Sequence, residues 1–229
     1  KVAKAVFILG EIEGEYRNPK ILYNFGINIV ETIHKENGIY YKLNPSQLMF
    51  SKGNFLERKR IIPLVKEGEI IVDMFSGLGY FSLGLAKFSK ARKIYSIEKN
   101  PVAFKYLKEN LKLNRVENKV EVINGDCREE VDKLVEKGIK ADRVVMGYLP
   151  PPMEFVDYAL KIVKENGIIH YECLLNDDEK IRQKEIYEIL EEINEKAGKQ
   201  RKKIKLLSVN YVKDYAPHIE HCVLDLEVN

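Results

Sequence analysis

The chain has 229 residues, of which 45% are hydrophobic and 32% are charged, and its net charge is +3. That charge is too small to indicate a nucleic-acid partner by itself, and three widely spaced cysteines without a CxxC pair favour reduced thiols over a disulfide framework or a metal site. No apolar run approaches the roughly 18 residues that span a bilayer, and acids follow the first ten residues too soon for a secretory signal, so we expect a cytoplasmic protein with no membrane partner. As a separate expectation, we take the protein to be a monomer.

The first 60 residues predict a small β-rich N-terminal domain and a connector. Short strands interrupted by polar residues are expected at 4–10, 21–26 and 31–43, with turn signals at 24–26 and 36–38. The connector at 50–60 concentrates cations, which is typical of a solvated face but is also what phosphate contacts require. We place a second domain at 61–229.

From about residue 69 onward, apolar runs alternate with amphipathic stretches. Helices are expected at 80–88, 101–114, 127–138 and 153–166. They separate buried strands expected at 69–75, 93–98, 120–125, 141–147 and 167–173. In the helix at 101–114, Pro101 occupies the first turn, where proline is tolerated. The alternation predicts an α/β fold in which a parallel sheet carries helices on both sides.

The last part of the chain departs from this alternation. A long charged helix is expected at 177–198, followed by strands at 203–212 and 218–228 with no helix between them. Two such strands pair as an antiparallel hairpin, with the turn expected at 214–217. Seven strands that end in an antiparallel hairpin are typical of the Rossmann-like class I methyltransferase fold, whereas the dinucleotide-binding Rossmann fold lacks this hairpin.

The stretch DMFSGLGYF, residues 73–81, lies where the first parallel strand ends and its helix begins. Gly77 and Gly79 allow a turn whose backbone approaches a ligand closely. The third glycine of a dinucleotide fingerprint is missing, and an acidic Asp73 suits a sulfonium and amino acid better than a pyrophosphate. The alternative is a plain turn between a strand and a helix.

Two further carboxylates close neighbouring strands. Glu98 ends the second parallel strand, where a carboxylate accepts hydrogen bonds from both hydroxyls of a ribose. Asp126 follows the third strand, where it could accept from an adenine amino group while the backbone of Cys127 contacts the ring. Each has a structural alternative, since Glu98 could be a helix-capping or surface acid and Asp126 the N-cap of the next helix. Ligands of such sheets bind outside the carboxyl ends of the strands, and all these residues lie there.

Several long motifs together carry a specific resemblance. The stretches 14–20, 31–51 and 54–60, followed by DMFSGLGYFSL and IEKNP, resemble the archaeal and eukaryotic tRNA enzymes that modify the purine 3′ of the anticodon. That family contains guanine N1-methyltransferases and the wybutosine-pathway aminocarboxypropyltransferases. The resemblance implies S-adenosylmethionine as cofactor and the anticodon region of tRNA-Phe as partner, in an archaeal protein. The cofactor-binding residues that we expect are Ser51, Arg58, Asp73, Phe75, Gly77, Gly79, Glu98, Lys99, Asn100, Asp126, Cys127 and Gly147.

The residues after the fourth strand bear on which group is transferred. The family's methyltransferases carry an Asn-Leu-Pro type motif there, whereas this chain has Gly147, Tyr148 and Leu149, and VVMGY resembles the aminocarboxypropyltransferases. We therefore expect transfer of the 3-amino-3-carboxypropyl group to the wyosine precursor 4-demethylwyosine, which releases methylthioadenosine. The prolines at 150–152 partly resemble the methyltransferase loop, so guanine-37 N1-methylation stays an alternative, and a non-catalytic tRNA-binding protein is a third.

Catalytic roles are expected for Tyr148 and Arg58. Arg58 could pair with the cofactor carboxylate, although a phosphate-binding or structural arginine is the alternative. No residue is an obvious general base, and Tyr148, His170 and Glu172 are the three possibilities. We interpret His170 as a buried strand histidine with a satisfied hydrogen bond. The spacing of His218 and His221 puts them on opposite faces of a strand, which does not favour a metal pair.

Overall fold

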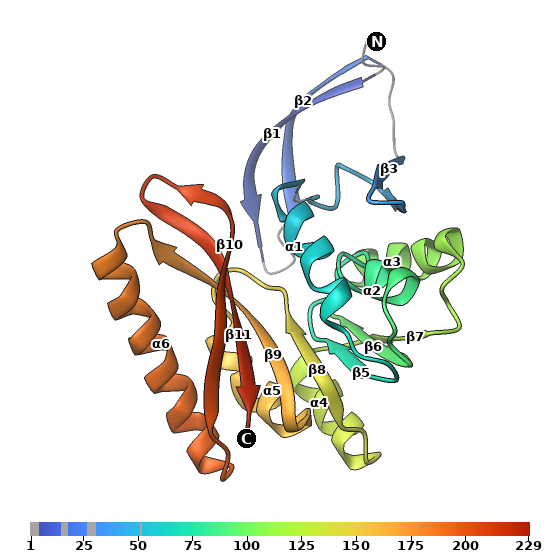
Figure 1. The fold of residues 1–229 in the computed structure, drawn as a ribbon. Coiled ribbons are helices and arrows are strands. Elements are labelled where there is room, and N and C mark those ends of the chain that lie inside the picture. The colour runs from blue at the N-terminus through green and yellow to red at the C-terminus, as the bar shows by residue number, and fades with distance from the viewer. Residues whose placement is uncertain (1–4, 15–17, 27–30, 51) are drawn as a thin grey trace.

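A seven-stranded sheet forms the centre of the molecule (Figure 1). The structure is a computed structural model that describes residues 5–14, 18–26, 31–50 and 52–229. The strands are β5 (Ile70–Asp73), β6 (Lys93–Glu98), β7 (Val120–Asn124), β8 (Ala141–Met146), β9 (Val163–Asn176), β10 (Ile204–Ala216) and β11 (Ile219–Val228). They lie in the order β10-β11-β9-β8-β5-β6-β7, with β5 to β9 parallel and β11 antiparallel to β9 and β10. The predicted fold class is confirmed.

Helices cover both faces of this sheet (Figure 1). One face carries α2 (Ser82–Phe88) and α3 (Pro101–Asn114), and the other carries α4 (Cys127–Glu136), α5 (Val156–Ile162) and α6 (Glu179–Lys199). Buried apolar side chains form one cluster beneath each set, with Leu107 at 0% exposure in the first and Leu160 at 0% in the second. Because these parallel strands are buried on both faces, their sequences are continuous apolar runs.

The helix expected at 153–166 is shorter than its pattern predicts. The structure has a 3-10 helix, η3 (Met153–Phe155), then α5, and the chain enters β9 already at Val163. Lys202, which is distant in sequence, donates hydrogen bonds to the carbonyl oxygens of Leu160 and Val163, where α5 ends. A tertiary contact thus satisfies carbonyls that a longer helix would have bonded internally. The turn expected at 214–217 is also tighter, because the hairpin strands extend to Ala216 and resume at Ile219.

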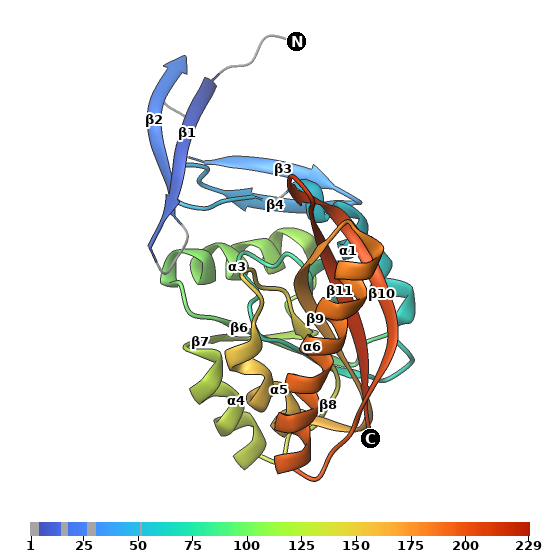
Figure 2. The same ribbon diagram turned by 90° about the vertical axis from the view of Figure 1, so that its left-hand side faces the viewer.

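The N-terminal part forms two hairpins (Figure 2). They pair β1 (Ala5–Glu13) with β2 (Asn18–Gly26), and β3 (Thr32–Glu36) with β4 (Ile39–Leu43). Asn37 and Gly38 turn the second hairpin with positive φ, as the Asn-Gly signal predicts. The signal at 24–26 belongs instead to the end of β2, since those residues pair with β1. The β1–β2 hairpin projects from the rest of the molecule.

The β3–β4 hairpin is attached to α3 through two asparagines. The side chain of Asn110 accepts from Lys42 N and donates to Lys42 O, and Asn114 makes the same two bonds with Tyr40. The edge of β4 is therefore satisfied by side chains in place of another strand. Apolar residues of β4 also join the core cluster of α2 and α3. The division at residue 60 stays a prediction.

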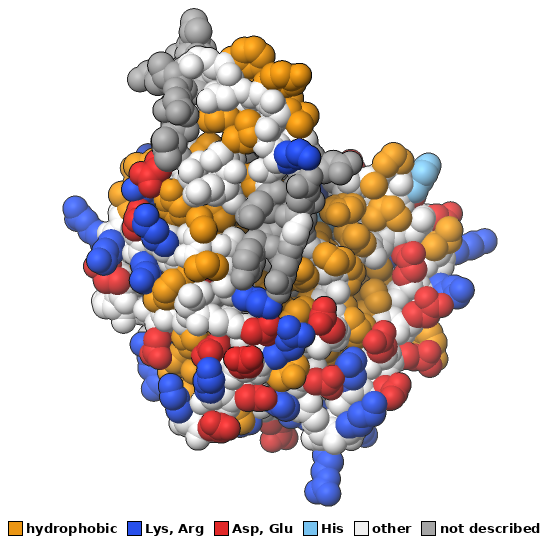
Figure 3. Space-filling model, turned by 180° about the vertical axis from the view of Figure 1, so that it is seen from behind, with side chains coloured by type: hydrophobic (Ala, Val, Ile, Leu, Met, Phe, Trp, Pro, Cys, Tyr) orange, Lys and Arg blue, Asp and Glu red, His pale blue; other side chains and the backbone are white. Residues whose placement is uncertain are grey.

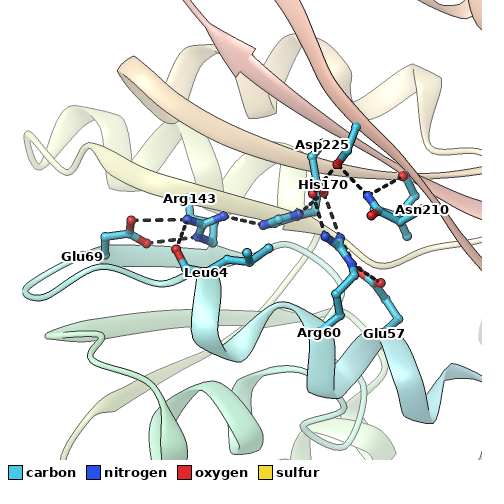
Figure 4. A network of polar contacts seen from close by, with 10 residues as sticks. Glu57, Arg60, Leu64, Glu69, Arg143, His170, Asn210 and Asp225 are labelled. Carbon is cyan, nitrogen blue, oxygen red and sulfur yellow. Dashed lines mark hydrogen bonds and ion pairs between the residues drawn. The ribbon is translucent and has the colours of Figure 1, made fainter.

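A buried polar network joins the connector to the sheet (Figure 4). The connector folds as η1 (Lys52–Asn54), α1 (Phe55–Arg60) and η2 (Ile62–Leu64). Arg60 donates to both carboxylate oxygens of Asp225 on β11, at 2.7 and 2.9 Å. Asp225 also lies 2.6 Å from Nδ1 of His170, whose Nε2 lies 2.7 Å from Arg143. Arg60 thus turns toward the sheet, and of the connector's cations only Lys59 is exposed among those whose side chains the structure describes.

The surface differs from one end of the molecule to the other (Figure 3). Seen from behind, hydrophobic side chains gather in the upper half, and charged side chains of both signs cover the lower half. At the top, the β1–β2 hairpin carries exposed apolar side chains, which include Val6, Leu22, Tyr23 and Phe25. Across the described ranges, no helix combines the length and apolar character needed to cross a membrane.

Candidate active site

A cavity of about 670 Å³ opens at the carboxyl ends of the parallel strands. Its lining comes from the turns after β5, β6, β7 and β8, from Glu172 on β9, from β10, and from residues between β4 and α1. This volume lies within the usual range for small-molecule sites, and the position is where ligands of open α/β sheets bind. The sequence-predicted residues that line it are Arg58, Phe75, Gly77, Glu98, Lys99, Asn100, Asp126, Cys127, Gly147 and Tyr148.

The turn after β5 owes its shape to two glycines. Gly77 and Gly79 have φ of 56° and 103°, and a Cβ on Gly79 would lie 2.7 Å from Cγ of Leu83. Asp73 and Gly79 do not contribute to the cavity wall, so they shape the turn from beneath. Asp73 is fully buried, and burial raises its pKa to about 7 although Ser82 donates to its Oδ2 at 2.6 Å.

Glu98 ends β6 and holds the turn in place. Its Oε2 accepts from Gly77 N–H and its Oε1 from Asn100 N–H, both at 2.7 Å. Burial raises the pKa of Glu98, and these backbone donors oppose that effect. Because each carboxylate oxygen carries two acceptor sites, Glu98 retains capacity for hydroxyl donors from the cavity.

Asp126 caps α4, as its structural alternative predicts. Its Oδ1 accepts from Arg128 N–H at 3.0 Å, and the Arg128 guanidinium and Lys99 contact the same carboxylate. Hydrogen bonds from Arg128 hold the pKa of Asp126 well below its usual range. Cys127 beside it is buried, and burial raises the pKa of its thiol to about 12. The thiol therefore stays protonated at neutral pH, and Cys127 lines the cavity without acting as a nucleophile.

Arg58 lies at the other side of the cavity. Its Nε and Nη2 donate to Glu36 on β3 at 2.8 and 2.9 Å, and its guanidinium lies over the ring of Phe50. Arg58 is 5% exposed, so this paired geometry is held inside the protein. Ser51, the remaining predicted contact in this segment, lies outside the described residues.

Gly147 and Tyr148 follow β8 and lie against aromatic side chains. The Tyr148 ring stacks on Phe75 with centroids 5.0 Å apart, and Phe155 packs edge-on against both. The prolines at 150–152 lead into η3 and thereby bring Phe155 back over the strand end. A Cβ on Gly147 would lie 2.7 Å from Cε2 of Phe81, so a side chain here would displace that ring.

The cavity also has walls that sequence patterns did not predict. Phe155, Lys213 and Tyr215 line it without having been named, and Glu172 was named only as one of three possible bases. An aromatic residue three positions after a proline run is a signal that could have pointed to Phe155. No local sequence signal predicts that Lys213 or Tyr215 lines the cavity, because only the folding of the final hairpin brings this part of β10 there.

The histidines fall into three environments. His170 is buried between Arg143 and Asp225, away from the cavity wall, which supports its interpretation as a satisfied strand histidine. His218 lies in the turn before β11 and not on a strand face as expected, where it contacts Asp177. His221 is buried beside Glu172. Within the described ranges, no three His, Cys, Asp or Glu side chains are grouped as a metal site.

The sheet order, the final hairpin and a cavity over the carboxyl ends define a class I methyltransferase fold. Residues 32–204 match the family model described as the TRM5/TYW2 methyltransferase domain. The chain therefore belongs to this family, which confirms the resemblance seen in the sequence.

Two archaeal relatives of this chain are named for two different activities. The tRNA(Phe) (4-demethylwyosine(37)-C(7)) aminocarboxypropyltransferase of Methanocaldococcus jannaschii is 40% identical over 94% of this chain and 82% of its own length. The tRNA (guanine(37)-N(1))-methyltransferase Trm5b of Pyrococcus abyssi is 38% identical over 100% of this chain and 65% of its own length.

Solved structures are similar throughout the chain. Methanocaldococcus jannaschii TYW2 in complex with AdoMet has a TM-score of 0.79 at 40% identity, covering 92% of this chain and 90% of that one. Pyrococcus horikoshii TYW2 in complex with MeSAdo has a TM-score of 0.76 at 37% identity, covering 92% and 74%. Trm5b from Pyrococcus abyssi has a TM-score of 0.80 at 38% identity, covering 99% and 64%.

Proposed function

We propose that this chain transfers the 3-amino-3-carboxypropyl group of S-adenosylmethionine to 4-demethylwyosine at position 37 of tRNA(Phe), releasing methylthioadenosine. The observation that carries this proposal is the 40% identity, over 94% of the chain, with the Methanocaldococcus jannaschii aminocarboxypropyltransferase. We also propose that it acts as a monomer in the cytoplasm of an archaeal cell.

The cavity lining suits such a donor. We assign Glu98 and Asn100 to the ribose, and Asp126, Lys99 and Cys127 to the adenine side. We assign Gly77, which lines the cavity, to the sulfur region, with Asp73 and Gly79 shaping its turn from outside the cavity wall. The donor's sulfonium activates both its methyl and its Cγ carbon toward attack, so selection depends on which carbon faces the acceptor. We assign Phe75 and Tyr148 to the wall beside the target ring, and Arg58 to the donor carboxylate. For Ser51, we propose a contact with the cofactor on the ground of the family resemblance alone.

Gly147 supports aminocarboxypropyl transfer. It occupies the position at which the family's methyltransferases carry asparagine, by the resemblance described above. The close approach of Phe81, 2.7 Å from a Cβ placed on Gly147, leaves no room for an asparagine side chain unless Phe81 moves. A guanine-positioning amide is thus missing here, and the space is closed by an aromatic ring.

Labelled donor distinguishes the two transfers. tRNA(Phe) that already carries the 4-demethylwyosine modification is incubated with the protein and with S-adenosylmethionine labelled either in its carboxyl or in its methyl carbon. We expect carboxyl label in the tRNA and methyl label in released methylthioadenosine. Glu98→Gln should lose the activity, whereas Glu121→Gln, which changes an exposed acid on β7, should keep it.

Guanine-37 N1-methylation is the second candidate, because Trm5b of Pyrococcus abyssi matches the whole chain at 38% identity. Methyl label that enters tRNA(Phe) bearing an unmodified guanine, with no carboxyl label entering the precursor tRNA, would replace the proposal with this activity.

A further inference from the structure

One carboxylate in the cavity wall differs from the others in its hydrogen bonding. Glu98 accepts two backbone N–H donors, Asp126 is bound by Arg128, and Glu154 at the rim lies 3.5 Å from the same guanidinium. Glu172 lines the same cavity, and its Oε1 is buried with no hydrogen-bond partner among the described residues. Burying an oxygen that accepts no hydrogen bond lowers the stability of the fold, unless a bound ligand donates a hydrogen bond to it.

Glu172 is buried in the cavity wall and lies beside His221. The residue is 4% exposed on β9, and its Oε2 lies 3.2 Å from Nε2 of His221, which is 0% exposed on the adjacent β11. Neither ring nitrogen of His221 has an aligned hydrogen-bond partner in the described part of the chain. Oε1 lies 3.6 Å from the position of a Cβ on Gly147, at the carboxyl end of β8. Because residue 147 is a glycine, it places no side chain of its own next to Oε1.

The sheet order separates this oxygen from the adenosine end of the cavity. Glu98 and Asp126 lie over β6 and β7, whereas Glu172 lies on β9, beyond β5 and β8. A donor whose ribose binds at Glu98 must extend its amino-acid chain across the turn after β5, toward β8 and β9. Of the two cationic groups of that chain, the sulfonium has no hydrogen to donate, so the group that can give Oε1 a hydrogen bond is the α-ammonium.

We propose that Glu172 binds the α-ammonium of the donor's amino-acid chain, with His221 positioning the carboxylate from behind. This inference rests on the proposed use of S-adenosylmethionine, but it holds for either transferred group. Anchoring the ammonium at the end of β8 places the carbon chain beside Gly147 and Tyr148, where we place the target ring.

Binding of three ligands tests the assignment without any turnover. S-adenosylmethionine carries both ammonium and sulfonium, S-adenosylhomocysteine carries only the ammonium, and methylthioadenosine carries neither. We expect Glu172→Gln, measured by calorimetry, to weaken the first two ligands by about 10- to 100-fold, the value of a charge-assisted hydrogen bond, and to leave methylthioadenosine within about twofold. Retained methylthioadenosine binding also shows that the variant is folded.

The matched control is Glu165→Gln, an equal charge change at an exposed position on the same strand, which should leave all three affinities unchanged. Equal weakening of all three ligands, or weakening of S-adenosylmethionine alone, would overturn the assignment, since the first indicates a general effect and the second a sulfonium contact. Unchanged affinities with a lowered transfer rate would also overturn it in favour of a proton-accepting role. Failure of the labelled-donor experiment would leave these binding results unaffected.

Discussion

At the scale of single residues, the turn after β5 combines a buried acid with tightly placed glycines. Asp73 has one oxygen on Ser82 and an Oδ1 without a hydrogen-bond partner among the described residues. Its pKa of about 7 means that the folded protein keeps a proton that the unfolded chain releases near pH 4. The fold consequently binds more protons than the unfolded chain between these two values, and its stability falls as pH rises through that window.

Asp73→Asn should remove this dependence. In ligand-free protein, we expect the free energy of unfolding of the parent to drop by about 2–4 kcal/mol more than that of the variant between pH 4.5 and pH 8. Urea denaturation at a series of pH values measures it. Glu165→Gln serves as the reference and should follow the parent, and parallel curves for parent and Asp73→Asn would show that Asp73 is ionised throughout.

At the scale of elements, an edge strand is held by side chains of a helix. Asn110 is 0% exposed and bonds both backbone groups of Lys42, as well as the carbonyl of Leu78 at 3.1 Å. The same helix thus secures the β3–β4 hairpin and the turn that forms the cavity floor. Glu36 on β3 in turn holds Arg58 at the cavity.

Asn110→Ala should loosen that attachment. Three buried backbone groups lose their partner, so we expect a loss of about 2–4 kcal/mol in unfolding free energy. Hydrogen exchange should rise at the amides of β4 and stay slow in β5 and β8. Asn118→Ala, at an exposed position, should stay within about 0.5 kcal/mol of the parent. Uniformly faster exchange would mean that the hairpin is not a separately secured element.

At the scale of the whole molecule, Asp225 joins elements far apart in sequence. Burial raises the pKa of Asp225, but hydrogen bonds from His170 and Arg60 outweigh burial and hold the pKa well below its usual range (Figure 4). The contribution of this group to stability is therefore present at neutral pH and lost as pH falls below about 4. It connects α1 with β9 and β11, so the connector is part of the core.

Removing that charge should be costly at neutral pH. We expect Asp225→Asn to lower the free energy of unfolding by about 2–4 kcal/mol, because Arg60 and His170 lose the carboxylate that they share while Arg60 keeps Glu57, and to reduce the acid dependence below pH 4. Glu188→Gln, which breaks an exposed helix pair with Lys184, should cause no measurable change. A loss that is the same at pH 3 and pH 7 would exclude the charge as its cause.

Local patterns were sufficient for most elements of the sheet. The alternation of apolar runs and amphipathic stretches placed β6, β7, α3 and α4 within a residue or two of their bounds, because burial on two faces and helix capping leave signals within a few residues. The carboxyl ends of parallel strands converge by geometry alone, so the expected gathering of Glu98, Asp126 and Gly147 followed from strand order.

The tertiary structure decided the partners of these residues. Arg58 pairs with Glu36, 22 residues away, Arg60 with Asp225, 165 residues away, and Lys202 ends α5. Such contacts depend on how hairpins and helices pack and leave no periodic mark in the sequence. The same holds for Glu172, which any pattern shows as one more acid on a strand. Only the folded sheet shows that His221 lies beside it, that Gly147 places no side chain next to it, and that one of its oxygens is buried in the cavity wall without a hydrogen-bond partner among the described residues.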